Sequence, residues 1–172
     1  MRLTVETRLP WDIEADVLAV TVPADDELPP YLTEIDRRTD GAISQLRSAG
    51  ALKGKLWDDR LLPAKGMAAR FVLIVGVDDG SAIDRLGARR LGAVMVKRLA
   101  GLEVATLAIH LPDELVSRGG ASQADVVELL VRGLVEGSAD PKAIYNEVEE
   151  GVPELDAVTV VVESGQADAL QT

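Results

Sequence analysis

Residues 71–80, FVLIVGVDDG, are where this sequence comes nearest to a phosphate-binding turn. A continuous apolar run ends at Gly76 and is followed by Asp78, Asp79 and Gly80. A dinucleotide-binding turn needs G-x-G-x-x-G between strand and helix, because the glycines let the pyrophosphate approach the backbone. Here the spacing is G-x-x-x-G, the two carboxylates would repel a phosphate, and no G-x-x-x-x-G-K-[ST] motif occurs. We interpret Gly76 as a tight exit from a strand and expect no nucleotide to bind there.

Other residue types that can carry chemistry are isolated in the sequence. The sole histidine, His110, ends a strand pattern before Pro112, and a structural or solvated role explains it more simply than catalysis does. Adjacent carboxylates on a strand point to opposite faces and do not naturally share a metal ion; these pairs are Asp58–Asp59, Asp78–Asp79 and Glu149–Glu150. No G-x-S-x-G motif surrounds any serine, including Ser44, Ser48, Ser81 and Ser122. We therefore predict no catalytic, cofactor-binding or metal-binding residue in this chain.

One predicted helix has a basic side. Arg85 and Arg89 share a face through their i, i+4 spacing, and Arg90, Lys97 and Arg98 add further positive charge. This side of the helix is either a docking surface for an acidic partner or an ordinary solvated face. The solvated face is the commoner outcome.

Composition limits the classes of function that need consideration. The 172 residues suffice for one domain with a hydrophobic core, and hydrophobic residues make up 47% of them. A net charge of −11 opposes binding to nucleic acid and to anionic membranes. The absence of cysteine excludes disulfides and thiolate metal sites. The sequence has no membrane-spanning run, and its first residues lack the apolar core of a signal peptide, so we expect a cytoplasmic protein.

The elements that must position these residues alternate between strand and helix patterns. Apolar runs or alternating patterns predict strands at residues 2–7, 16–22, 56–63, 70–77, 103–111 and 157–163, with 56–63 at a sheet edge because of its polar middle. Helical spacing covers 31–48, where Gly41 offers a break, and two further helices open at Ser81 and Ser122, each with an aspartate three residues later. Residues 23–30 are predicted as loop, and 136–156 as a surface loop with a short helix.

Predicted inward side chains follow the helical period. They are Leu32, Ile35, Ile43 and Leu46 in the first helical region, Ile83, Leu86, Leu91, Val94, Met95 and Leu99 in the second, and Val127, Leu130, Val131 and Leu134 in the third. Alternation of apolar strands with such helices predicts an α/β fold, namely a three-layer α/β/α domain around a mostly parallel sheet.

Segment order in residues 40–80 resembles the N-terminal domain of the leucyl aminopeptidase (cytosol aminopeptidase) family. LKGK at 52–55 matches a family turn, LLP at 61–63 the end of a family strand, and ARFVLIVGV at 69–77 the next strand. The resemblance continues through LGARRLGAVMVKRL at 86–99, VATLAIHLP at 104–112, VVELLVRGLVEGSAD at 126–140 and LDAVTVVV at 155–162. These are packing motifs, so they indicate the family without indicating a chemistry. Two departures are GVD for the family's GLG, and Ala139 where a tyrosine is common.

The resemblance implies a macro-domain-like fold with a six-stranded mixed sheet, over residues 1–163, followed by the start of a linker at 164–172. In the family, a larger C-terminal catalytic domain carries two divalent metal ions, zinc or manganese, and the peptidase residues. Its NTDAEGRL-type motif has no counterpart here. The implied function is therefore a non-catalytic accessory domain, partnered by its own catalytic domain within a cytosolic metallo-aminopeptidase that is a homo-hexamer and removes leucine-type N-terminal residues from peptides.

Two alternatives remain at this point. The first is a stand-alone macro-like module that binds ADP-ribose or another nucleotide, but VPADDELPP at 22–30 lacks the asparagines and glycines that such modules carry there. The second is a DNA-contacting domain, which only the basic helix favours and the net charge opposes.

Overall fold

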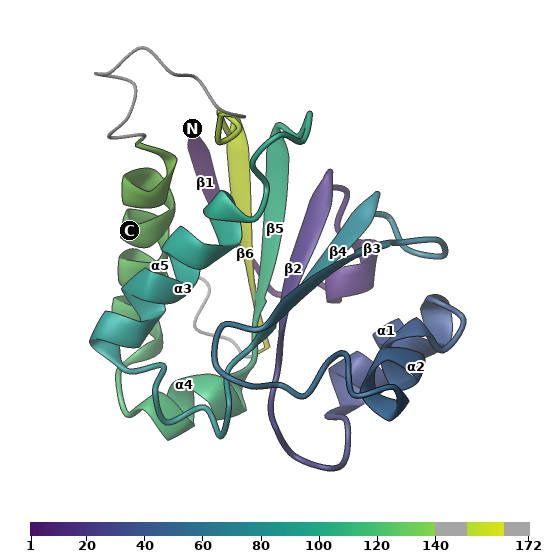
Figure 1. The fold of residues 1–172 in the computed structure, drawn as a ribbon. Coiled ribbons are helices and arrows are strands. Elements are labelled where there is room, and N and C mark those ends of the chain that lie inside the picture. The colour runs from purple at the N-terminus through teal and green to yellow at the C-terminus, as the bar shows by residue number, and fades with distance from the viewer. Residues whose placement is uncertain (140–150, 164–172) are drawn as a thin grey trace.

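The computed structural model describes residues 1–139 and 151–163, and a six-stranded sheet runs through this part of the chain in the order β1-β6-β5-β2-β4-β3 (Figure 1). Strand β3 is antiparallel to β4, and all other neighbouring pairs are parallel. The predicted mostly parallel mixed sheet is confirmed, with the antiparallel strand at an edge as expected. The strands are β1 (Arg2–Glu6), β2 (Val17–Val22), β3 (Asp59–Pro63), β4 (Phe71–Gly76), β5 (Thr106–Leu111) and β6 (Ala157–Val162).

Helices cover both faces of the sheet, which confirms the predicted three layers (Figure 1). One face packs against α1 (Pro30–Arg38) and α2 (Ala42–Ser48), and the other against α3 (Arg85–Lys97), α4 (Asp113–Gly119) and α5 (Gln123–Ser138). A 3-10 turn, η1 (Pro10–Asp12), lies between β1 and β2. No helix within residues 1–139 and 151–163 is long and apolar enough to cross a membrane.

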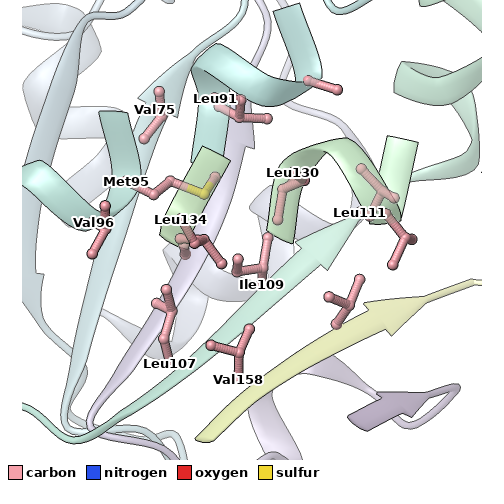
Figure 2. Packing of buried hydrophobic residues seen from close by; sticks show 14 of the residues in the cluster. Val75, Leu91, Met95, Val96, Leu107, Ile109, Leu111, Leu130, Leu134 and Val158 are labelled. Carbon is pink, nitrogen blue, oxygen red and sulfur yellow. The ribbon is translucent and has the colours of Figure 1, made fainter. Parts of the chain in front are cut away.

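Strand β2 shows why both faces are covered. All six of its residues are buried, and successive side chains enter opposite cores: Val17 and Ala19 lie in the α3/α5 core, whereas Leu18 and Val20 lie in the α1/α2 core. Figure 2 shows the first of these cores, in which helix residues such as Met95 and Leu130 meet strand residues such as Ile109. The larger core is therefore the one that holds α3 and α5 on the sheet.

Glycines allow α3 and α5 to pack in close contact. A Cβ at Gly133 would lie 1.8 Å from the carbonyl oxygen of Arg89, and one at Gly92 would lie 2.0 Å from the carbonyl oxygen of Leu130. Any larger residue would force the two backbones apart. The sequence alone had not indicated this contact, because glycine in a helix more often weakens it.

Two expectations about α3 were wrong. Its N-cap is Asp84, whose Oδ1 accepts a hydrogen bond from the Gly87 amide at 2.9 Å, and Ser81 instead bonds to Asp79 through its amide and hydroxyl. The turn that leaves β4 uses up the residues before Asp84, so the helix begins later than predicted. Leu86 is 55% exposed, because Gly87 and Ala88 are the positions that face the core in the first turn.

Elsewhere the helix and strand predictions hold with local differences. Gly41, with φ of +76°, does divide the 31–48 region into two helices, and Ser122 does cap α5 by accepting from the Asp125 amide. Helix α4 was not predicted, and α5 continues to Ser138, into the segment expected to be loop. Residues 140–150, including Glu149–Glu150, and the predicted linker 164–172 lie outside the described residues.

Asp16, just before β2, connects the start of three strands. Its Oδ2 accepts hydrogen bonds from the amides of Ala105 and Thr106, at 2.8 and 3.0 Å, and from the Thr106 hydroxyl. Its Oδ1 accepts from Arg70 at 3.0 Å, immediately before β4. The backbone amide of Ala105, with further hydrogen bonds from Arg70 and Thr106, lowers the pKa of Asp16 despite partial burial.

We expect Asp16→Ala to reduce the free energy of unfolding at pH 7 by about 2–3 kcal/mol, because two backbone donors lose a charged acceptor. The pKa of Asp16 is depressed in the folded state, so its contribution is present above the unfolded pKa of about 3.9 and is lost as pH falls through the lower folded value. Urea unfolding at pH 7 and at pH 3 measures both effects. The exposed neighbour Glu14, changed to Gln, is the control. A difference from wild type that stays constant between the two pH values would contradict this role.

We also expect Gly133→Ala to destabilise the fold by about 1–3 kcal/mol through overpacking, although alanine favours an isolated helix by about 1 kcal/mol. The new Cβ would meet the Arg89 carbonyl oxygen at 1.8 Å. Thermal unfolding compares this variant with Val135→Ala on the exposed side of the same helix, where Val135 is 52% exposed. A stabilised Gly133→Ala protein would show that α3 and α5 are not in this close contact.

Candidate functional site

A pocket of about 470 Å³ lies at the carboxyl ends of β2, β4 and β5. Strand β2 leads to α1 on one face of the sheet, whereas β4 leads to α3 and β5 to α4 on the other (Figure 1). Crevices at such points, where the connections diverge, are the usual ligand sites of open α/β sheets. The lining residues are Thr21, Pro23, Asp25, Asp26, Glu27, Leu28, Pro29, Pro30, Tyr31, Val77, Asp79, Gly80, Pro112, Glu114, Leu115 and Arg118.

The Gly76 turn at one side of this pocket is filled by protein backbone. A Cβ at Gly76 would lie 2.0 Å from the carbonyl oxygen of Lys55, and one at Gly54 would lie 2.3 Å from the carbonyl oxygen of Pro23. Gly54 also has φ of +72°, which a glycine adopts without strain. Gly76, which had suggested a phosphate loop, and Gly54 thus let three loops pack against one another.

Five backbone amides within residues 76–81 already have partners within the chain. A phosphate cradle needs several free N–H groups that point at the anion. Here the amides donate to carbonyl or carboxylate oxygens of the protein itself: Gly76 to Asp58, Val77 to Val22, Asp78 to Gly54, Gly80 to Val77 and Ser81 to Asp79. These amides are therefore not free to bind an anion.

The two aspartates of the turn differ in role. Asp78 has a backbone φ of +56°, and its carbonyl oxygen accepts from the amide of Ala24 at 2.9 Å. The side chain of Asp79 accepts from the hydroxyl and amide of Ser81, and these hydrogen bonds lower its pKa. Asp79 lines the pocket and presents its carboxylate there. This charge opposes phosphate, as the sequence had indicated.

Arg118, on α4, is the one cationic side chain that lines the pocket within residues 1–139 and 151–163. Its guanidinium donates to the Asp79 carbonyl oxygen at 2.9 Å and to Glu114 Oε1 at 2.6 Å, and lies 3.6 Å from Asp25 Oδ2. One side chain thereby connects the loops that follow β2, β4 and β5. Sequence analysis missed it, since helix α4 carried no strong pattern.

His110 is a buried structural residue, in line with the simpler of its two sequence interpretations. It is 2% exposed, its ring packs on Tyr31 with centroids 4.5 Å apart, and its Nε2 lies 3.4 Å from Glu163 Oε1. This contact is the main cause of the lowered pKa of Glu163, which also accepts from the Asp113 amide. Tyr31 donates to the Thr21 carbonyl oxygen at 2.6 Å, and burial raises the pKa of its hydroxyl. His110 supports the pocket wall through Tyr31, since Tyr31 itself lines the pocket.

The basic side of α3 is largely paired within the chain. Arg85 pairs with Asp125 at 2.5 Å and Arg89 with Glu136 at 2.5 Å, and Arg98 forms an ion pair with Asp59. Intramolecular carboxylates therefore already occupy three of the five side chains that had suggested a docking surface. These ion pairs connect α3 and the residue after it to α5 and β3.

The remaining candidates do not converge on a site. Ser44 donates to Asp36, and Ser48 to the carbonyl oxygen of Ser44. Within residues 1–139 and 151–163, no three His, Asp or Glu side chains are placed to hold a metal ion. This part of the chain therefore does not fit the pair of divalent metals that the family resemblance associates with a catalytic domain.

A sequence model of the cytosol aminopeptidase family, N-terminal domain, matches residues 17–139. The chain belongs to this family. The "Probable cytosol aminopeptidase" of Acidithiobacillus ferrooxidans is 28% identical to it over 122 residues, which are 70% of this chain and 24% of the relative. The described family domain thus spans about a quarter of the length of the curated relatives it matches.

A solved aminopeptidase and a solved macrodomain both have a fold similar to that of this chain. A leucine aminopeptidase from tomato, a K354E mutant, has a TM-score of 0.77 and 16% identity, over 99% of this chain and 35% of that one. A macrodomain from Trypanosoma brucei in complex with ADP-ribose has a TM-score of 0.66 and 11% identity, over 98% of this chain and 67% of that one. The predicted macro-domain-like fold of this family domain is confirmed.

We expect this family domain not to bind ADP-ribose, because its turn amides are already paired and carboxylates line the pocket. Calorimetry with ADP-ribose should give no heat of binding, with the Trypanosoma brucei macrodomain as positive control. Asp79→Asn should not create binding, since it removes a charge without freeing the amides of Gly76, Val77 and Asp78. A micromolar dissociation constant for ADP-ribose, in the wild-type family domain or in its Asp79→Asn variant, would contradict the prediction.

Proposed function

We propose that this chain is a non-catalytic accessory domain of a cytosolic metallo-aminopeptidase that removes leucine-type N-terminal residues from peptides. The observation that carries the proposal is the match of the family's N-terminal domain to residues 17–139. The fold similarity to the tomato leucine aminopeptidase also supports it. This chain covers 35% of that longer chain, as one domain of a larger enzyme would. Under this proposal residues 1–163 form the accessory domain and 164–172 begin a linker.

The chemistry of the parent enzyme would belong to its catalytic domain. A metal-activated water is the usual nucleophile of a metallo-peptidase, and two zinc or manganese ions would supply it there. No residue of this chain is assigned a catalytic, cofactor-binding or metal-binding role. Its proposed partner is that catalytic domain, within a homo-hexameric parent. The cytosolic location is supported by the name of the curated relative.

Two features of the accessory domain suit a scaffold role. Its loops at the carboxyl edge of the sheet are tied together by Arg118 and by backbone hydrogen bonds around Gly76. Its basic helix is held by intramolecular ion pairs with Asp125 and Glu136. Neither arrangement leaves a nucleophile beside a base and an oxyanion donor, which acyl transfer requires. Rigid presentation of surface to another domain is the function that remains.

We expect the 172-residue chain alone to have no peptidase activity. Leucine p-nitroanilide, incubated with the chain and Zn²⁺ or Mn²⁺, should be hydrolysed no faster than in buffer with the metal ion. The physical reason is that residues 1–139 and 151–163 place no group of metal-binding side chains together. The full-length Acidithiobacillus ferrooxidans relative serves as the positive control for the assay. Hydrolysis that follows the chain through successive purification steps would overturn the proposal.

A further inference from the structure

The pocket at the carboxyl ends of β2, β4 and β5 is lined by charged side chains that an accessory role does not explain. Among the residues that the structure describes, five carboxylates and one guanidinium line it, and their charges sum to −4. The carboxylates come from three separate segments: Asp25, Asp26 and Glu27 follow β2, Asp79 follows β4, and Glu114 is on α4. Three folded segments thus bring like charges around one cavity, with Asp25, Asp26 and Glu27 exposed at its rim.

The wall between these carboxylates is apolar and aromatic. Leu28 and Tyr31 contribute from one side of the sheet, and Val77 and Leu115 from the other. The Tyr31 ring is held by its hydrogen bond to the Thr21 carbonyl oxygen and by its contact with His110. A fixed aromatic ring beside carboxylates is a combination that attracts organic cations, because the ring face also carries negative potential. A cavity of about 470 Å³ is in the size range of small-molecule sites.

Arg118 offsets part of this negative charge, at Glu114 and Asp25. Its donors are already engaged with the Asp79 carbonyl oxygen and with Glu114, and its charge faces Asp25. Asp26 and Glu27 have no such cation among the lining residues. The lining therefore keeps its excess of negative charge mainly at Asp26 and Glu27, while Arg47 donates to the carbonyl oxygens of Pro23 and Asp25 in the same loop.

Two other ligand classes fit poorly. Anions meet the carboxylates and find the amides of the Gly76 turn already paired. A bare metal ion needs several oxygen ligands that converge at one point, and the described part of the chain brings no three such side chains together. Carboxylates that are spread around an apolar wall suit a ligand whose charge and apolar surface are separate.

We propose that this pocket binds small organic amines that carry an apolar body, with the ammonium group at the carboxylates of residues 25–27 and the apolar part against Tyr31, Leu28, Val77 and Leu115. This inference goes beyond the accessory role and does not depend on it. A titration of the isolated 172-residue chain tests it without any peptidase assay, so the two proposals fail separately.

Amide NMR titration at low salt is the direct test, with three probes of one shape: phenethylamine, phenethyl alcohol and phenylacetate. Phenethylamine should shift the amide resonances of residues 21–31, 77–80 and 112–118. It should bind about tenfold more tightly than the alcohol, because a few exposed charge pairs together contribute about that factor in affinity. Phenylacetate should bind more weakly than either. Equal affinity for amine and alcohol, or shifts elsewhere, would overturn the proposal.

Matched charge variants separate the local field from the net charge of the whole chain. The triple variant Asp25→Asn, Asp26→Asn, Glu27→Gln should lose about tenfold in affinity for phenethylamine. The control triple Glu14→Gln, Glu103→Gln, Glu128→Gln changes the net charge by the same amount on residues that do not line the pocket. It should change affinity less than about twofold, because the Coulomb energy of a charge pair falls with separation. An equal loss in both triples would show general electrostatics and overturn the site.

A substitution in the apolar wall tests the second half of the proposal. Leu28 is half-buried and packs on the α1/α2 core from the pocket side, so Leu28→Ala should leave the dispersion of the amide spectrum intact. It should weaken phenethylamine and phenethyl alcohol by a similar factor, because both lose the same apolar contact. Unchanged affinity for both ligands would place the amine outside the pocket.

Discussion

The carboxylate of Asp16 is the contact on which the arrangement of the central sheet depends. It lies at the start of β2 and accepts hydrogen bonds from Ala105 and Thr106 before and within β5, and from Arg70 before β4. One side chain therefore sets where three parallel strands begin. Since β2, β4 and β5 each have six residues, they also end close together. The pocket exists because these three carboxyl ends meet at one edge.

Loop packing at that edge decides what the pocket can bind. Gly54 and Gly76 let the segments after β2, before β3 and after β4 approach within backbone contact, and amides of one segment donate to carbonyl oxygens of another. Arg118 then joins the same edge to α4. On this macrodomain-like topology, five amides of residues 76–81 are paired and carboxylates line the pocket. A shared fold with a macrodomain that holds ADP-ribose is therefore compatible with a different ligand chemistry here.

Sequence patterns predicted the strands well. The apolar run of β2, which is buried on both faces, and the polar middle of the edge strand were sufficient to place both strands. They failed where a choice between neighbouring residues depended on packing: Asp84 rather than Ser81 caps α3, and Leu86 points to solvent. The pocket could not be predicted, because Tyr31, Asp79 and Arg118 are far apart in the chain and only the crossing connections bring them together.

The sequence by itself determined the fold class, the family resemblance and the absence of a phosphate-binding motif, because these depend on hydrophobic period and on local glycine spacing. Only the tertiary structure decided which charged side chains become neighbours. Arg85, Arg89 and Arg98 meet carboxylates from other elements, whereas the carboxylates after β2 and β4 gather around a cavity. The physical reason is that charge acts over several ångströms in space, and spacing along the chain does not report which charges become neighbours.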